Sequence, residues 1–260
     1  MPASSFAFLD WPGPIAFAHQ GGANEFPTNT MKAFDGSVAM GYRYIETDLQ
    51  VTSDGVLVTF HDDTLDRVTD HTGAISSLPW SVVKEARVNG TEPIPRFEDV
   101  LEAHPDIRFN IEPKTDQSVQ PFIDAVQRTG TINRICCGSF SDARLKKIRK
   151  ALGPGLCTGT GNVDTGRLRA ASWVPIRAVA KALARTNAAC TQVPPKKSVI
   201  TIVDRRFVGF AHELGLAVHV WTIDDRAEIN RLLDLGVDGV MTDSPSVLKD
   251  ALVQRGQWVS

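Results

Sequence analysis

Short apolar runs rich in β-branched residues alternate with longer amphipathic stretches along nearly the whole chain. The short runs predict strands and the amphipathic stretches predict helices, because strands and helices bury their side chains with periods of about 2 and 3.6 residues. The predicted strands are Ile15–Ala18, Tyr44–Val51, Ile107–Glu112, Ile135–Gly138, Leu156–Thr158, Ala189–Val193, Ala217–Trp221 and Gly239–Met241. The predicted helices are Asn29–Met40, Phe97–Ala103, Val119–Arg128, Asp142–Ala151, Ile176–Ala184, Asp204–Leu214, Arg226–Leu235 and Val247–Gln254.

This alternation predicts an α/β protein with a parallel sheet. Eight strand–helix units in a chain of 260 residues favour a single closed (β/α)8 TIM barrel, which we expect to span residues 10–255. No Gly-x-Gly-x-x-Gly pattern follows the first predicted strand, which argues against a dinucleotide-binding fold.

Two segments interrupt the pattern. Val56–Phe60 is predicted to pair with the second strand as a hairpin across the turn Ser53–Gly55, and a long polar excursion then extends to about Pro95. The segment from Gly159 to Ser172 is expected to be irregular. The barrel should therefore carry a hairpin and loop excursion after its second strand.

Composition narrows the class of protein. Apolar residues make up 42% of the chain, the net charge is −2 and the pI is about 6.3, so a nucleic-acid binder is not expected. The four cysteines form no Cys-x-x-Cys pair and are predicted to be buried free thiols. The chain begins without the pattern of a secretory signal and contains no apolar run of membrane-spanning length, so we expect a cytoplasmic protein.

Chemistry-bearing side chains gather where predicted strands end. His19 ends the first strand, and Glu46 and Asp48 lie two residues apart on the second, so both carboxylates face one way. Glu112 ends the third strand and Lys114 follows it, while the hairpin returns to His61. Because active sites of such barrels lie at the carboxyl ends of the strands, we expect these side chains to lie together.

This set of residues suits phosphodiester cleavage. Three carboxylates can share one hard divalent cation, which relieves their repulsion and can polarise a phosphoryl oxygen. Lys114 offers a positive charge to a phosphate, and His19 and His61 can act as general acid and general base. Asp62 is expected to orient His61.

With these residues in view, the sequence resembles the glycerophosphodiester phosphodiesterase family over nearly its whole length. The motifs that carry the resemblance are His19–Gly22, Glu25–Thr30, Glu46–Gly55, His61–Asp62, Leu65–Thr69, Ile111–Lys114, Val220–Ile223 and Gly236–Asp243. The family implies a TIM barrel, one Ca²⁺ or Mg²⁺ ion, and hydrolysis of glycerophosphodiesters to an alcohol and glycerol 3-phosphate, a reaction of lipid and glycerol metabolism.

Site roles follow from the resemblance residue by residue. His19 and His61 would be catalytic, and Glu46, Asp48 and Glu112 would be metal ligands. Lys114 would contact the phosphate and Trp221 would line the substrate pocket.

Two positions depart from the family pattern. Gln20 stands where the family usually has arginine, so a bidentate charged contact to phosphate is replaced by neutral hydrogen bonds from a substrate-contacting or supporting amide. Asp224 stands where asparagine is common. A subgroup of the family acts as lysophospholipase D, and the motif Gln192–Pro194 resembles that subgroup.

Several alternatives remain open from the sequence. The substrate is a small glycerophosphodiester or a lysophospholipid, and a barrel that binds phosphodiesters with little catalysis is a third reading. The nucleophile is water or a neighbouring substrate hydroxyl that forms a cyclic phosphate. Neither the acid among the two histidines nor the identity of the metal follows from the residues.

A peripheral membrane contact is also predicted as a hypothesis. Trp173 is expected in the loop after the fifth strand, and Arg177, Lys181 and Arg185 recur every four residues on the next helix. Such a face could meet anionic lipid headgroups while the tryptophan enters the acyl region. A solvated basic helix face is the alternative.

Overall fold

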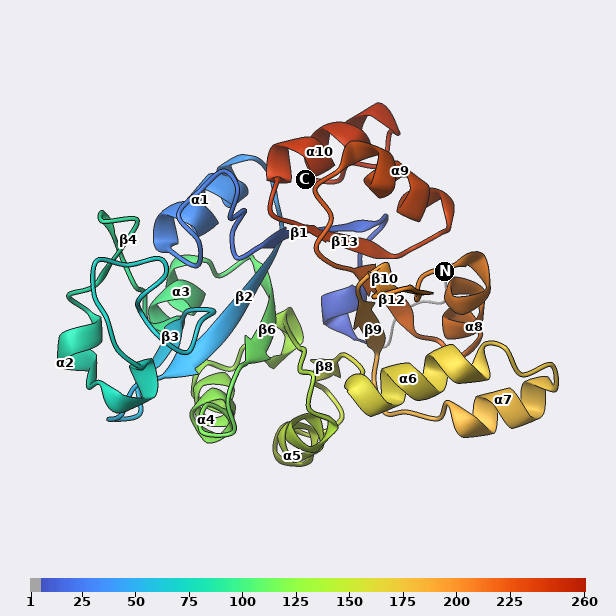
Figure 1. Cartoon of the computed structure of the whole chain (residues 1–260), viewed down its shortest axis with the longest axis horizontal. Coiled ribbons are helices and arrows are strands. Elements are labelled where there is room, and N and C mark those ends of the chain that lie inside the picture. Colours follow the sequence, from blue (N-terminus) through green and yellow to red (C-terminus); the bar gives the residue numbers. More distant parts are fainter. Residues whose placement is uncertain (1–5) are drawn as a thin grey trace.

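The fold is a barrel of eight parallel strands surrounded by helices, as the alternating pattern predicts (Figure 1). The computed structural model describes residues 6–260. Its barrel strands are β1 (Ile15–His19), β2 (Tyr44–Val51), β6 (Arg108–Pro113), β7 (Ile135–Cys137), β8 (Cys157–Thr158), β9 (Cys190–Val193), β12 (Ala217–Val220) and β13 (Gly239–Thr242). The hydrogen-bonded order is β8-β7-β6-β2-β1-β13-β12-β9.

The barrel closes between β8 and β9 through a short seam. The amide of Ala189 donates to the carbonyl of Thr158 at 2.9 Å, and the amide of Thr160 donates to the carbonyl of Cys190 at 3.0 Å. A parallel bridge joins Gly159 to Cys190. Because β8 is only two residues long, this seam has fewer backbone contacts than the pairing of β2 with β6.

Helices cover the outside of the barrel (Figure 1). They are α1 (Met31–Ala39), α3 (Phe97–Ala103), α4 (Val119–Thr129), α5 (Asp142–Leu152), α6 (Asn162–Ala171), α7 (Arg177–Leu183), α8 (Arg205–Glu213), α9 (Arg226–Asp234) and α10 (Pro245–Gln254). Side chains fix where several of them begin, since Thr30, Ser141, Asp204 and Asp225 each accept a hydrogen bond from the free amide three residues on.

A second apolar cluster fills the barrel interior at its amino-terminal end. The segment η1 (Ala7–Leu9) crosses this end and inserts Phe8, which is buried against Phe17 and Tyr44. The Tyr44 hydroxyl donates to the carbonyl of Phe8 at 2.7 Å, so the aromatic plug also has its polar atom satisfied. This end of the barrel is therefore closed by protein.

The excursion after β2 has more structure than a polar loop. Strand β3 (Leu57–Thr59) pairs antiparallel with β2, as the hairpin predicts. The rest contains η2 (Ile75–Ser77), α2 (Trp80–Val83), β4 (Arg87–Val88) and β5 (Glu92–Pro93). Its spaced apolar residues form a small core of their own, with Phe60, Leu65, Ile75, Val83 and Val88 buried.

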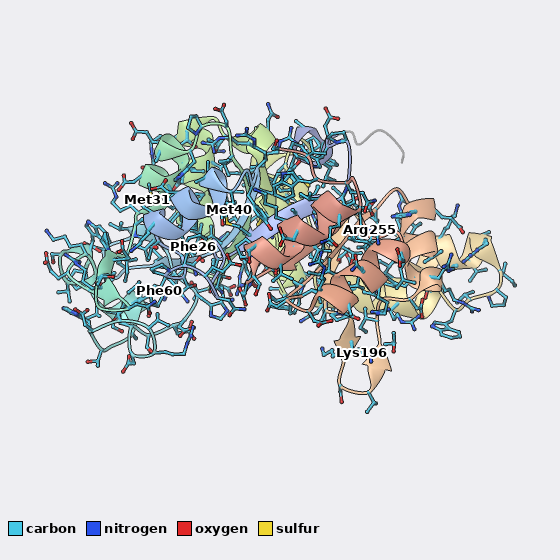
Figure 2. The ribbon with its side chains drawn as sticks, turned by 90° about the horizontal axis from the view of Figure 1, so that it is seen from above. Phe26, Met31, Met40, Phe60, Lys196 and Arg255 are labelled. Atoms are coloured by element: carbon cyan, nitrogen blue, oxygen red, sulfur yellow. The ribbon has the colours of Figure 1, made fainter. Side chains whose placement is uncertain are left out.

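Two other segments differ from the sequence prediction. The stretch from Gly159 to Ser172 was expected to be irregular, but α6 occupies most of it, with Leu168 and Ala171 buried against the barrel. The hairpin β10 (Lys196–Lys197) and β11 (Ile200–Thr201), which follows β9, was not predicted. Figure 2 shows it projecting from the body of the protein at Lys196.

Within residues 6–260, no helix combines the length and the apolar character needed to cross a membrane.

Candidate active site

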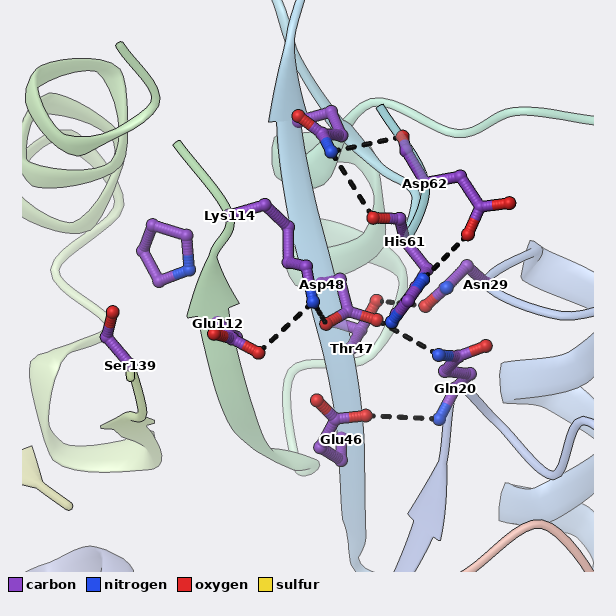
Figure 3. Close-up of polar contacts among 12 residues, drawn as sticks. Gln20, Asn29, Glu46, Thr47, Asp48, His61, Asp62, Glu112, Lys114 and Ser139 are labelled. Carbon is purple, nitrogen blue, oxygen red and sulfur yellow. Dashed lines mark hydrogen bonds and ion pairs between the residues drawn. The ribbon is translucent and has the colours of Figure 1, made fainter. Parts of the chain in front are cut away.

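Several of the predicted site residues lie close together at the carboxyl end of the barrel, which we call the mouth; Figure 3 shows Gln20, Glu46, Asp48, His61, Glu112 and Lys114 there. In the register of the sheet, His19 lies beside Glu46, and Asp48 lies beside Glu112. The antiparallel β3 then returns the chain so that the amide of Phe60 donates to the carbonyl of Asp48 at 3.0 Å, which brings His61 to the same mouth.

The three carboxylates repel one another in a poorly solvated position. Glu46 and Asp48 are 5% and 2% exposed. Burial and the neighbouring Asp48 raise the pKa of Glu46 to about 8. Burial likewise raises the pKa of Glu112, against the opposing effect of Lys114. Among the described residues, no three carboxylates bring their oxygens within 4.8 Å of one another, so the group is clustered but held apart.

Lys114 separates two of these carboxylates. Figure 3 shows its side chain reaching between Asp48 and Glu112, and its Nζ lies 3.3 Å from an oxygen of each. Burial alone would lower the pKa of Lys114, but the two carboxylates raise it above its ordinary value. The ammonium group therefore remains charged and partly neutralises the mouth.

His19 contacts two carboxylates, Glu46 and Asp243, and the sequence analysis did not single out Asp243. Its Nδ1 donates to Asp243 at 2.6 Å, and its Nε2 lies 3.7 Å from Glu46. Burial would lower the pKa of His19, but Glu46 and Asp243 outweigh it and raise the pKa to about 9. The hydrogen bond to Asp243 fixes the ring and leaves Nε2 facing the carboxylates.

Asp224, the second departure from the family pattern, supports Asp243. One oxygen of Asp224 accepts hydrogen bonds from the Thr242 hydroxyl and the Asp243 amide at 2.8 Å, and from the Ser244 amide at 3.1 Å. These bonds hold the turn after β13 that presents Asp243 to His19. A carboxylate oxygen suits this place, because all three partners are donors.

His61 is oriented by Asp62, as predicted. Its Nδ1 donates to Asp62 at 2.7 Å, and Arg67 binds the same carboxylate at 2.5 and 2.9 Å. Hydrogen bonding from Arg67 lowers the pKa of Asp62 to about 2, so this group remains a carboxylate. The side-chain amide of Gln50 donates to the backbone carbonyls of His61 and Asp62 and so holds this pair of residues at the mouth.

Gln20 is buried and its side chain is already engaged. The side-chain amide donates to Asp48 at 3.1 Å, its carbonyl oxygen accepts from the Thr28 hydroxyl, and its backbone amide donates to Glu46 at 3.3 Å. Here Gln20 orients two of the carboxylates (Figure 3). A contact between Gln20 and the substrate phosphate stays a prediction.

Asn29 is a further buried residue at the mouth to which the sequence analysis gave no role. Its side-chain carbonyl accepts from the Thr47 hydroxyl at 2.6 Å, and it adopts a left-handed backbone with φ of 57°. Its Nδ2 has no hydrogen-bond partner among residues 6–260. Asn29 thus keeps one buried donor unsatisfied in this part of the chain.

Trp221 stands at the end of β12, where its pocket role was predicted. Its ring packs edge-on against Phe140, which follows β7, with ring centroids 5.8 Å apart. Phe140 is 52% exposed. The mouth thus carries an aromatic wall next to its charged face.

Trp173 was expected in the loop directly after the fifth strand. In the structure, α6 lies between that strand, β8, and Trp173. Trp173 is 58% exposed, and Arg206 covers its ring at 4.3 Å. Arg177 and Lys181 both pair with Glu213, which neutralises part of the predicted basic face. A membrane contact stays a prediction.

A protein-family model and individual known proteins that match this chain point to the same family. A model of the glycerophosphoryl diester phosphodiesterase family matches residues 19–247. "Probable glycerophosphodiester phosphodiesterase 2" of Mycobacterium tuberculosis is 35% identical, with 98% of this chain and 97% of the relative covered. Human lysophospholipase D GDPD1 is 28% identical, with 90% and 85% covered.

Solved structures share the fold. A glycerophosphodiester phosphodiesterase from Agrobacterium tumefaciens superimposes with a TM-score of 0.72 at 24% identity, covering 90% of this chain and 99% of the other. An Oleispira antarctica phosphodiesterase, solved with its product sn-glycerol-3-phosphate, gives a TM-score of 0.75 at 23% identity and covers 93% and 97%.

The role of Asp243 can be measured directly. Replacing it by asparagine removes a negative charge that favours the imidazolium, so the pKa of His19 should fall below about 9 in metal-free protein. Titration of the imidazole resonances by NMR would report this. Asp62→Asn is the matched control and should leave the His19 titration in place. An unchanged His19 titration in Asp243→Asn would contradict the assignment.

Proposed function

The chain belongs to the glycerophosphoryl diester phosphodiesterase family, and on that premise we propose that it hydrolyses glycerophosphodiesters to an alcohol and glycerol 3-phosphate by paired histidine catalysis. One observation carries the proposal. Two histidines at one mouth, His19 and His61, each donate a hydrogen bond from Nδ1 to a carboxylate, and the buried Glu46 and Asp48 lie on β2, the strand that pairs with both β1 and β3.

The carboxylate face fits a divalent cation. Glu46, Asp48 and Glu112 supply only oxygen donors, which hard cations such as Ca²⁺ and Mg²⁺ prefer. Burial and the neighbouring carboxylates raise the pKa values of Glu46 and Glu112, and a bound cation would stabilise the charged forms of both groups. These three residues would hold the ion, and the bound ion would withdraw charge from a phosphoryl oxygen.

Lys114 would then be free for the substrate. Without a metal ion, the ammonium group of Lys114 supplies the positive charge between Asp48 and Glu112. Once those carboxylates have another partner, its ammonium group can pair with a phosphate oxygen.

The two histidines divide the proton transfers. Asp243 and Asp62 hold the Nδ1 protons, so each Nε2 is the nitrogen that gives or takes a proton. One Nε2 accepts the proton of the attacking hydroxyl as its oxygen bonds to phosphorus. The other donates a proton to the alcohol oxygen as its bond to phosphorus breaks.

A lysophospholipid is the second candidate substrate. Phe140 exposes half of its side chain beside Trp221 at the mouth, where an acyl chain attached to the glycerol could lie. Human lysophospholipase D GDPD1 is among the relatives of this chain. The reaction at phosphorus would use the same residues for both substrates. Only contacts of the acyl chain with Phe140 and Trp221 would make the enzyme prefer a lysophospholipid.

The histidine roles predict large losses of activity. His19→Ala and His61→Ala should each lower kcat on glycerophosphocholine by about 10²–10⁴-fold, because each removes one proton transfer. Glycerol 3-phosphate release measures the rate. His71→Ala is the matched control, since the His71 ring pairs with the neighbouring Asp70 in the excursion after β2, and it should keep full activity. A folded His19 or His61 variant with near-normal kcat would refute the pairing.

The metal assignment predicts loss of activity on chelation and coupling to pH. Exhaustive treatment with EDTA should abolish hydrolysis, and Ca²⁺ or Mg²⁺ should restore it. Because the pKa of Glu46 is about 8 without metal, the cation must displace a proton at pH 7, and its affinity should weaken as the pH falls below 8. Calorimetry in two buffers of different ionisation heat counts the released protons. Activity that survives full chelation would overturn the assignment.

The aromatic wall separates the two substrates. If acyl chains pack on Phe140, Phe140→Ala should lower kcat/KM for lysophosphatidylcholine roughly tenfold relative to glycerophosphocholine. Val253→Ala, which truncates an exposed side chain on α10, should change neither value. Equal effects of Phe140→Ala on both substrates would argue against the lysophospholipid candidate.

A further inference from the structure

Three cysteines line the barrel interior below the mouth. Cys136, Cys157 and Cys190 come from the consecutive strands β7, β8 and β9, and all three are at most 1% exposed. The sheet register pairs Asn110 with Cys136, and Cys136 with Cys157, so these side chains share the interior face. Cys137 alternates to the opposite face and packs against the surrounding helices.

The sulfur atoms have the spacing of a metal–thiolate site. The Sγ atoms of Cys136 and Cys190 are 3.8 Å apart, and all three sulfurs lie within 4.8 Å of one another. No other group of three potential ligands in residues 6–260 is as close. A tetrahedral zinc ion with Zn–S bonds of about 2.3 Å holds two sulfurs roughly 3.8 Å apart.

A buried histidine without a full set of partners lies on the strand that pairs with β9, although its ring nitrogens are not within 4.8 Å of all three sulfurs. His219, on β12 beside β9, is 0% exposed. Its Nδ1 lies 3.5 Å from the side-chain amide of Gln192, whereas its Nε2 has no hydrogen-bond partner among the described residues. A buried polar nitrogen left unpaired costs about 1–3 kcal/mol, and a bond to a metal would remove that cost.

A side-chain amide donor also lies at the sulfurs. The side-chain amide of Gln192 lies 3.9 Å from the sulfur of Cys136. Amide donors near sulfur stabilise metal-bound thiolates and orient them.

We propose that Cys136, Cys157 and Cys190 bind one zinc ion inside the barrel, separate from the carboxylate site at the mouth, and that His219 turns toward the sulfurs to become the fourth ligand. Three thiolates and one imidazole form a closed tetrahedral set with no open position, which indicates a structural and not a catalytic ion. The ion would join β7, β8, β9 and β12 across the short seam between β8 and β9. Because the ligands are fully buried, it would enter as the barrel folds.

Cobalt substitution tests the site in the full chain. Protein produced in cobalt-supplemented medium should show thiolate-to-cobalt charge-transfer absorption in the near ultraviolet and the strong visible bands of tetrahedral cobalt. Cobalt bound only by the carboxylates at the mouth gives neither. Cys136→Ser should reduce the charge-transfer band severalfold, and Cys137→Ser, its neighbour on the outer face, should leave it unchanged.

Metal content provides a measurement that needs no variant. Protein produced with zinc and washed with EDTA should retain about one zinc ion per chain, and a thiol-specific mercurial should release it. Wild-type protein without charge-transfer absorption and without retained zinc would overturn the proposal, as would an unchanged band in a folded Cys136→Ser variant. Hydrolytic activity is not the readout, so failure here would leave the proposed function untouched.

Discussion

Mutual repulsion among Glu46, Asp48 and Glu112 is the constraint around which the mouth of the barrel is organised. Parallel strands place the three side chains at one end, and burial removes much of the water that would screen them. Neighbouring groups reduce this repulsion. Lys114 bridges Asp48 and Glu112, and His19 faces Glu46. Gln20 donates hydrogen bonds to Glu46 and Asp48. The same repulsion is what suits the face to a divalent cation.

Closure of the barrel supplies the other half of the site. Because β13 pairs with β1, the residue that follows the last strand lies beside the residue that ends the first, and Asp243 meets His19 across most of the sequence. His61 gains its carboxylate from the adjacent position in the chain. The two histidines thus have similar support by different routes, one from the topology of the fold and one from local sequence.

The sequence predicted the parts of the structure that depend on periodicity and strand ends. The strands, the β3 hairpin and the convergence of His19, Glu46, Asp48, His61, Glu112 and Lys114 all follow from those two rules. Helix α6 was missed because its polar residues and a central glycine hide two buried positions. The partner of His19 was missed because no local pattern joins positions 19 and 243, although a closed barrel places the ends of its first and last strands side by side. The engagement of Gln20 with Asp48 depends on side-chain geometry that spacing alone does not encode.

The aromatic plug closes the amino-terminal end of the barrel and so makes the two ends of the barrel different. Among residues 6–260, Phe8 packs against Phe17 and Tyr44 and closes the amino-terminal end of the interior, so we expect substrate to reach His19 and His61 from the mouth. Substrate would then enter, and both products would leave, from the same end of the barrel, so the products would have to dissociate from the mouth before the next diester binds.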